Sequence, residues 1–470
     1  MDSLQNPSAL SASRSGRAIA GRCLKQERAL DEKKGSQRRE LLEDGFKAVS
    51  ESSETTIDEK IIAAMALRLQ KKLPDDRLAV AVSHVFMDAL SASLPGAPGA
   101  SLTAAIADTA YNAFLSAGPS KYKQDKRPEI LKDGFETLQM NSASKKERAM
   151  AEFGRAMLKE KHLIEAFYVM GAMSQPLPLP CAVHIARAVL RTTAVPVQQI
   201  SDWSRTAGVL KETFEAISTS PGISREEHEL AALGAVIAGE CSPGRESGAC
   251  ANSLLECIGT PFQGKVSAVI AQSALKSYPD VFLNEMNAVG EVVTRSFTAI
   301  KESPGASEGE KGLAALGLSA MDAASDRHPA LIFSKTVLAS LASSTGEPRD
   351  QTAARAALMT TSTGGGAGEK ITLFGMAFRS ILSYPSVTGE KRKIAEEIVG
   401  AAEHFKDPGL TFKVMCQLAE VYVGRKVKNP LGEVKAMLER AGQSEPRGKG
   451  SLIVEDEVLS IRGVRLKRRK

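Results

Sequence analysis

The chain has 470 residues, of which 43% are hydrophobic, 25% charged and 5% aromatic, and its formal net charge is +6. So small a charge does not suit a strongly basic nucleic-acid-binding domain, and the low aromatic content argues against a sheet core, because strands favour aromatic and β-branched residues. The six cysteines include no CxxC pair, which indicates buried thiols in a reducing compartment and no disulfide framework.

The first predicted element, residues 1–37, is a disordered segment. It begins MDSLQNPSALSASRSGRAIAGR, with five serines in the first fifteen residues and a single acidic residue. A stretch so poor in apolar residues cannot bury enough surface to fold on its own. No long apolar run follows the first charges, so we predict no secretory signal peptide.

The segment after it repeats. FEAISTSPGISREEHELAALG (214–234) and FTAIKESPGASEGEKGLAALG (297–317) are identical at 13 of 21 positions at an offset of 83 residues. Three more diverged copies extend the series, so the chain contains five copies of a unit of about eighty residues. Each copy starts at a phenylalanine that we call its anchor: Phe46, Phe135, Phe214, Phe297 and Phe378.

Within each copy, the pattern predicts two helices joined by a turn. Ser220-Pro221-Gly222 and Ser303-Pro304-Gly305 break the first helix, because proline cannot continue it and glycine supplies positive φ. A serine then precedes a glutamate by three residues, the spacing of a capping box at a new helix start. The predicted boxes pair Ser144 with Glu147, Ser224 with Glu227 and Ser307 with Glu310.

A glycine recurs seven residues after each of these glutamates, at Gly154, Gly234 and Gly317. Glycine inside a helix costs about 1 kcal/mol relative to alanine. Its recurrence in three copies therefore predicts a packing role, namely the close approach of a neighbouring helix.

The other half of each copy predicts a second helical hairpin, over residues 78–114, 162–193, 249–277, 330–360 and 410–441. The predicted fold is an all-α solenoid of about five four-helix units, or about ten hairpins, since one hairpin cannot bury its apolar face alone. A compact helical bundle is the alternative. The repeat domain spans residues 38–445, with units at about 38–128, 129–207, 208–290, 291–371 and 372–445.

Residues 446–470 form a basic C-terminal tail. Basic clusters can contact anionic surfaces, nucleic acid or a nuclear import receptor, although a solvated tail is the simpler interpretation. The candidate contact residues are Arg465, Lys467, Arg468, Arg469 and Lys470.

We find no motif for catalysis, cofactor binding or metal binding. Residues 363–370, TGGGAGEK, resemble a phosphate-binding loop, but Glu369 precedes the lysine and isoleucine follows it where serine or threonine is needed, so we predict a flexible loop. Cys181 and His184 lie one helical turn apart, which is too few ligands for a structural zinc site.

We expect neither nucleic-acid binding nor a membrane span. Repeats that read one base each are about thirty-five residues long and carry side chains that recur in every copy, unlike these. The most apolar stretches, such as residues 230–239, are about half the length needed to cross a bilayer.

The forty-residue hairpins, proline-containing turns and small-residue helices resemble HEAT or armadillo repeats over residues 38–445. Together with the serine-rich N-terminus, they are similar to bacterial type III secretion effectors built from helical repeats. That resemblance implies a non-enzymatic scaffold that is secreted into a host cell and binds a host protein in its cytoplasm or nucleus. Two alternatives stay open: an enzyme with a site assembled across the repeats, and a housekeeping scaffold in the bacterial cytoplasm.

Overall fold

The structure is a computed structural model. It describes residues 15–30, 34–73, 75–92, 102–117, 125–142, 144–193, 202–260, 264–278, 286–323, 327–343, 348–363, 366–404, 407–424, 432 and 436–440. The chain divides into two compact units, each described by itself. The N-terminal unit comprises Met1–Ile200, Gly208–Ala231 and Ile258–Pro261, and the C-terminal unit comprises Ser201–Ala207, Ala232–Cys257 and Phe262–Lys470.

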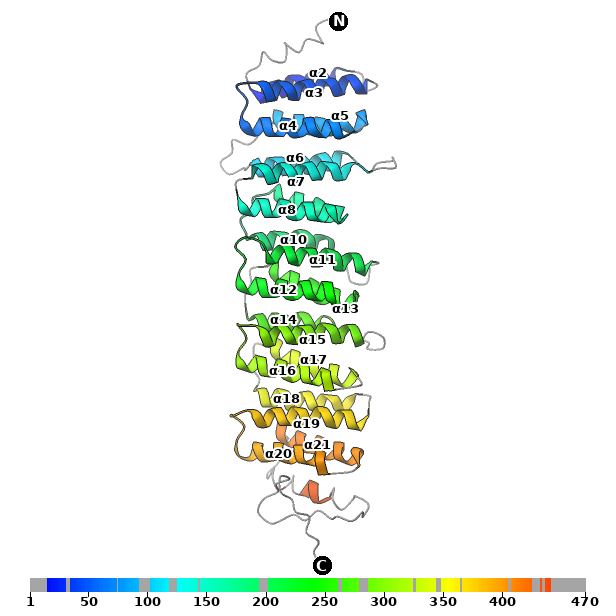
Figure 1. The fold of residues 1–470 in the computed structure, drawn as a ribbon, viewed down its shortest axis with the longest axis vertical. Helices are drawn as coiled ribbons and strands as arrows, with labels where there is room; N and C mark the ends of the chain where they lie inside the picture. Colours follow the sequence, from blue (N-terminus) through cyan, green and yellow to red (C-terminus); the bar gives the residue numbers. More distant parts are fainter. Residues whose placement is uncertain are drawn as a thin grey trace, which may run out of the picture. The chain divides into compact units, whose positions relative to one another are not determined.

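The helices of the N-terminal unit follow one another at short intervals (Figure 1). They are α2 (Gly16–Arg28), α3 (Gly35–Glu51), α4 (Ile57–Lys72), α5 (Asp76–Ser91), α6 (Leu102–Ser116), α7 (Arg127–Asn141), α8 (Lys145–Lys159), α9 (Leu163–Met173) and α10 (Cys181–Thr193). The next two, α11 (Trp203–Ser218) and α12 (Arg225–Glu240), contribute residues to both units.

The C-terminal unit continues the same pattern. Its helices are α13 (Arg245–Ile258), α14 (Val266–Leu275), α15 (Met286–Glu302), α16 (Glu308–Ala323), α17 (Arg327–Ala342), α18 (Arg349–Met359), α19 (Ala367–Ser383), α20 (Gly389–His404) and α21 (Pro408–Val423). A single 3-10 turn, η2 (Thr360–Ser362), follows α18.

The anchor phenylalanines lie in every fourth helix, namely α3, α7, α11, α15 and α19. We call these the A helices, and the three helices after each one B, C and D. All five anchors are fully buried. The prediction of an all-α solenoid built from about five four-helix repeats is therefore confirmed.

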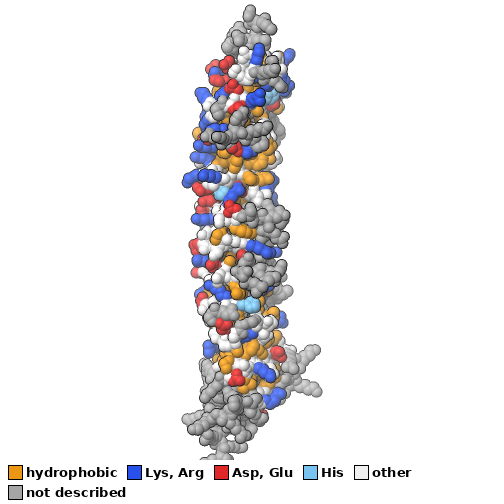
Figure 2. Space-filling view, turned by 90° about the vertical axis from the view of Figure 1, so that its right-hand side faces the viewer, with side chains coloured by type: hydrophobic (Ala, Val, Ile, Leu, Met, Phe, Trp, Pro, Cys, Tyr) orange, Lys and Arg blue, Asp and Glu red, His pale blue; other side chains and the backbone are white. Residues whose placement is uncertain are grey.

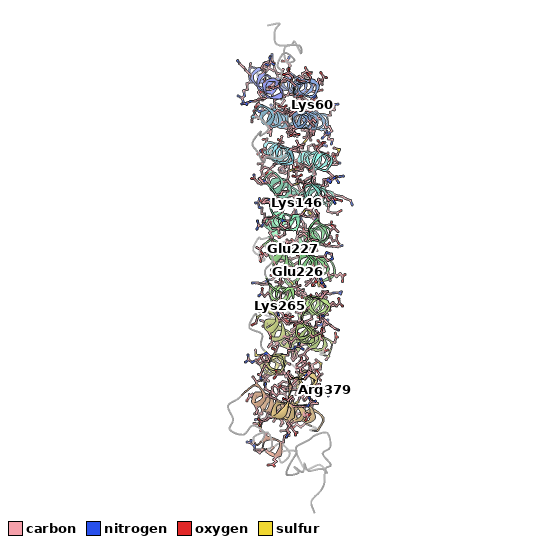
Figure 3. The ribbon with its side chains drawn as sticks, turned by 90° about the vertical axis from the view of Figure 1, so that its left-hand side faces the viewer. Lys60, Lys146, Glu226, Glu227, Lys265 and Arg379 are labelled. Carbon is pink, nitrogen blue, oxygen red and sulfur yellow. The ribbon has the colours of Figure 1, made fainter. Side chains whose placement is uncertain are left out.

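Within each unit the helices form two layers, and Figure 3 shows the helices of these layers end-on. In the N-terminal unit α3, α4, α7 and α8 pack in sequence as one layer, and α5, α6, α9 and α10 pack as the other. In the C-terminal unit α15, α16, α19 and α20 form the first layer, and α14, α17, α18 and α21 the second. The D helices α6, α14 and α18 thus each pack against the C helix of the following repeat, which is the stacking that a single hairpin lacks.

Helix α2 corrects one prediction, because residues 16–28 are helical and so are not part of a disordered segment. It packs on α3 and α5 as α6 packs on α7 and α9, which is the place of a D helix. Its apolar residues cover that face and are buried: Ile19, Ala20, Cys23 and Leu24. These four side chains lie on one face of the helix, and α5 covers that face. An isolated segment would have no such surface to pack against. Residues 1–14 lie outside the described residues.

The recurring glycine has the predicted packing role. A Cβ added to Gly154 would overlap the ring of Phe135, and one added to Gly317 would overlap the ring of Phe297. The anchors Phe135 and Phe297 therefore lie directly against the backbone of the B helices that follow them, α8 and α16. A helix with a side chain at this position could not approach so closely without displacing the ring.

The predicted helix caps are present at the starts of the B helices. The Ser224 and Ser307 hydroxyls accept from the backbone N–H groups of Glu227 and Glu310, whose carboxylates accept in return from the serine N–H groups. The Ser144 hydroxyl accepts from the Glu147 N–H at 3.1 Å. In the turn before α12, Gly222 has a φ of 77°, as predicted. In the turn before α16, Gly305 does not have a positive φ.

Candidate functional site

The residues that the sequence singled out do not assemble into a site. The basic tail residues Arg465 and Lys467 to Lys470 lie outside the described residues. In the loop that resembles a phosphate-binding motif, Lys370 is mostly buried, donates from Nζ to the Thr363 carbonyl at 2.6 Å, and lies 5.4 Å from the centre of the Phe412 ring. Lys370 therefore ties the loop to α19 and α21 and does not project toward a ligand.

Cys181 and His184 also serve the local fold. The Cys181 thiol is buried and donates to the Lys146 carbonyl at 3.7 Å, while His184 Nε2 accepts from the Leu179 N–H at 3.3 Å. The Lys146 ammonium donates to the Leu179 carbonyl at 2.7 Å, so these groups fix the loop between α9 and α10.

The cysteines do not offer a reactive thiolate. Burial raises the pKa of Cys181 and Cys241 to about 11, and that of Cys23 and Cys416 to about 12, so these thiols stay protonated at neutral pH. In the part of the chain that the structure describes, no three His, Cys, Asp or Glu side chains are placed to hold a metal ion.

A cluster of aromatic rings lies on α6 and α9 of the N-terminal unit. The Tyr111 and Phe167 rings stack at a centroid distance of 4.4 Å, Phe114 lies 4.8 Å from Phe167, and Tyr168 adjoins Phe167 at 5.6 Å. Each helix contributes at positions i, i+3 and i+4, which project from the same helix side. We call the set the aromatic surface: Tyr111, Phe114, Leu115, Ile164, Phe167 and Tyr168.

Two features hold these rings in place. Gly171 in α9 lets the Tyr111 ring lie against the backbone, since an added Cβ would be only 2.9 Å from Tyr111 Cε2. Arginines lie over the outer rings, with the Arg127 guanidinium 5.3 Å from the Phe114 centroid and that of Arg191 6.0 Å from the Tyr168 centroid. Such cation–π contacts favour fixed ring positions.

The aromatic surface is partly exposed to solvent. Leu115 and Ile164 at its rim are 54% and 53% exposed, and Tyr111, Phe167 and Tyr168 are half-buried. Figure 2, which faces the edge opposite the A–B turns, shows hydrophobic side chains reaching the surface among acidic and basic ones. Exposed apolar side chains next to aromatic rings and arginines are typical of the centre of protein interfaces.

The aromatic pair occurs in only one of the C helices. In α9, Phe167 and Tyr168 directly precede the buried pair Val169–Met170, and each other C helix has a buried apolar pair in the same place. The residues preceding those pairs are His84 and Val85 in α5, Asn252 and Ser253 in α13, Lys335 and Thr336 in α17, and Cys416 and Gln417 in α21. The stacking of repeats therefore does not require aromatic rings there.

This surface could not be recognised from the sequence, because its halves lie about fifty residues apart and each has ordinary core spacing. The sequence feature that could have revealed it is the Phe167–Tyr168 pair, at a position where the other copies carry no aromatic residue.

Comparisons with protein-family models, with curated proteins and with solved structures find no match to this chain. Among the described residues, no helix has both the length and the apolar character to span a membrane. The chain is thus an all-helical protein in which sequential helices pack as neighbours, and the surfaces themselves must carry any functional argument.

Proposed function

We propose that the chain is a non-enzymatic protein-interaction scaffold that binds a partner protein through the aromatic surface. The observation that carries this proposal is the half-exposed aromatic cluster on α6 and α9, at positions where the other repeats have no such rings. Residues that recur in every repeat build the stack, whereas residues that depart from the pattern are free to serve another role.

The chemistry of the surface suits a protein partner. Tyrosine, phenylalanine and arginine are enriched where interface side chains contribute most binding energy. Stacking on Tyr111 and Phe114 fixes the Phe167 ring before binding, and Gly171 lets the Tyr111 ring lie against the backbone, so little side-chain entropy is lost when a partner covers these rings. Leu115 and Ile164 would then be removed from water together with the rings.

Site-specific photo-cross-linking tests the proposal. Benzoylphenylalanine replaces Tyr168 in one variant and Thr336, the corresponding residue of α17, in a matched control. We expect the first variant to form discrete cross-links to another protein in a lysate of the target cells, and the control to form none of these. Failure of the Tyr168 variant to cross-link, or the same products from both variants, would exclude this surface as the binding site.

In the same proposal the partner is a host protein and the chain is a bacterial type III effector. Support for this part comes from the serine-rich composition of the first residues and from the resemblance to effectors built from helical repeats. Because α2 starts at Gly16 and covers α5, an export signal must lie before it to leave the fold intact.

The export experiment therefore deletes residues 2–14 and keeps α2. We expect the deleted chain to fold with unchanged helical content and to lose export through a type III system into host cells. A fusion of residues 1–15 to a reporter enzyme should be exported. Unchanged export of the deleted chain would contradict the effector assignment without affecting the aromatic surface.

A further inference from the structure

A groove in the C-terminal unit lies where α14, α16 and α18 begin, on the edge that Figure 3 faces and where Lys265 is labelled. Its volume is about 520 Å³, within the range of about 300–1,000 Å³ of ligand pockets. Lys265 is the N-cap residue of α14 and Gln272 lies within that helix. Ser307 and Glu310 come from the start of α16, and the last residues of α17 and the first of α18 complete the lining.

Among the described residues of the lining, the one carboxylate, that of Glu310, is already fully engaged. Glu310 accepts from the Ser307 N–H at 2.7 Å and the Ser307 hydroxyl at 2.6 Å, and from the Ser267 hydroxyl at 2.9 Å. The Lys265 ammonium lies 3.3 Å from Glu310 Oε1, the oxygen that also accepts from Ser267. Burial raises the pKa of Glu310, but these hydrogen bonds outweigh burial and lower it to about 2.

Arg349 is the charged side chain of the lining that has no carboxylate partner among the described residues. Its side chain is half-buried, its guanidinium lies 5.8 Å from the centre of the Tyr384 ring, and it packs against Gly309. In the part of the chain that the structure describes, Arg349 makes neither a hydrogen bond nor an ion pair. A partly desolvated guanidinium without a counter-charge is costly to maintain, and a carboxylate would offset that cost.

The room for Arg349 is specific to repeat 4. An added Cβ on Gly309 would overlap the guanidinium, so glycine at this position is what admits the arginine. The other described B helices carry a side chain at their second residue, and no other D helix that the structure describes begins with arginine. The B-helix residues are Asp58, Lys146, Glu226 and Glu390, and the D-helix residues are Gly16, Leu102, Cys181 and Val266.

We propose that this groove binds an acidic peptide segment of a partner protein, with a carboxylate of that segment paired to Arg349. Lys265 and Glu310 neutralise each other, so among the described lining residues Arg349 contributes an excess of one positive charge. Hydroxyl and amide groups at Ser307 and Gln272 line the space beside it, where they can serve a peptide backbone. This site involves none of the residues of the aromatic surface and does not depend on the function proposed for it.

Fluorescence anisotropy with a defined probe tests the assignment on the full-length chain. The probe is a hexapeptide of alternating serine and glutamate with blocked ends and a neutral fluorophore, and the same peptide with glutamine is its control. We expect the wild-type chain to bind the glutamate peptide in preference to the glutamine peptide, with an affinity that falls as salt rises.

Two variants change the groove in different ways. Arg349→Gln removes the charge, and Gly309→Ala displaces the mobile end of the arginine while keeping its charge. Each should weaken binding of the glutamate peptide on the order of tenfold, the size of one charge-assisted hydrogen-bonded contact. Arg355→Gln, two turns further along α18, removes the same charge outside the lining and should leave the affinity unchanged.

Circular dichroism checks that each variant keeps the helical content of the wild type. No binding of the glutamate peptide to the wild type, equal binding of both peptides, or equal loss in the Arg355 variant would each overturn the proposal. Because none of these variants touches α6 or α9, the outcome leaves the aromatic surface as a separate question.

Discussion

The junction of α6 with α9 in the N-terminal unit and that of α14 with α17 in the C-terminal unit are built by corresponding helices with different surfaces. With the buried positions of the D helices aligned, Ala271 and Ala274 of α14 correspond to Tyr111 and Phe114 of α6. Likewise Lys335 stands where α9 has Phe167, and its ammonium lies 5.4 Å from the centre of the Tyr278 ring.

This difference separates the residues that build the stack from those that the stack leaves free. Both junctions keep the same order of packed helices, and both units place a recurring glycine under an anchor phenylalanine. Small residues therefore suffice to join a D helix to the next C helix. The aromatic residues of α6 and α9 exceed what packing requires, which is why we assign them to binding.

The largest expected loss of stability comes from removing α2, which packs on α5 as a D helix packs on the C helix of the next repeat. Deleting residues 2–30 should lower the urea midpoint of unfolding markedly, because the loss exposes the face that Ile19, Cys23 and Leu24 cover. Each large apolar side chain contributes about 1.5–3 kcal/mol when buried. Deleting residues 2–14 is the control and should leave the midpoint unchanged. Equal midpoints for both deletions would show that α2 is not part of the stack.

The recurring glycine should behave alike in both units. Gly154→Ala and Gly317→Ala place a methyl group within the Phe135 and Phe297 rings, and overpacking of this kind costs about 1–3 kcal/mol. Gly312→Ala in α16 is the matched control, since its Cβ would lie 3.6 Å from Arg349 Nη1 in ordinary contact. Urea unfolding followed by circular dichroism measures all three. A tolerated Gly317→Ala would mean that the recurrence has another cause.

A smaller effect is expected from pH. The pKa of Glu310 falls from its ordinary value of 4.5 to about 2 in the folded chain, so its deprotonated form stabilises the fold. That contribution is fully present above about pH 5 and is lost as the pH falls toward 2. Glu310→Gln should therefore lower the unfolding midpoint at pH 7 and have less effect at pH 3. An effect of the same size at both pH values would contradict the hydrogen-bond assignment.

Much of the fold could be predicted from recurrence, because a turn, a cap or a close helix contact needs the same residue type in every copy. The anchor phenylalanines and the Ser–Glu caps are examples. Helix α2 could not be predicted this way, since it occupies the place of a D helix and the recurring anchor, turn and cap belong to the A and B helices. Its apolar face gains stability from contact with α3 and α5, which local composition does not report.

The candidate site was harder to predict from the sequence, because its residues do not recur in the other repeats. Tyr111 and Phe167 meet only through tertiary packing, and each has the helical spacing of an ordinary core residue. Similarly, Gly309 and Arg349 lie about forty residues apart, and neither residue alone marks a groove. A surface that occurs in one repeat has no counterpart in the other repeats, so only its departure from the repeat pattern can reveal it.

The most direct measurement gives α9 the residues of α13, through Phe167→Asn with Tyr168→Ser, and quantifies the partner protein recovered with the chain from target-cell lysate. Lys335→Ala with Thr336→Ala in α17 is the matched control. We predict that the α9 variant keeps its helical content and loses the partner, whereas the control retains it. Undiminished recovery of the partner with the folded α9 variant would contradict the claim that the departure from the repeat carries the function.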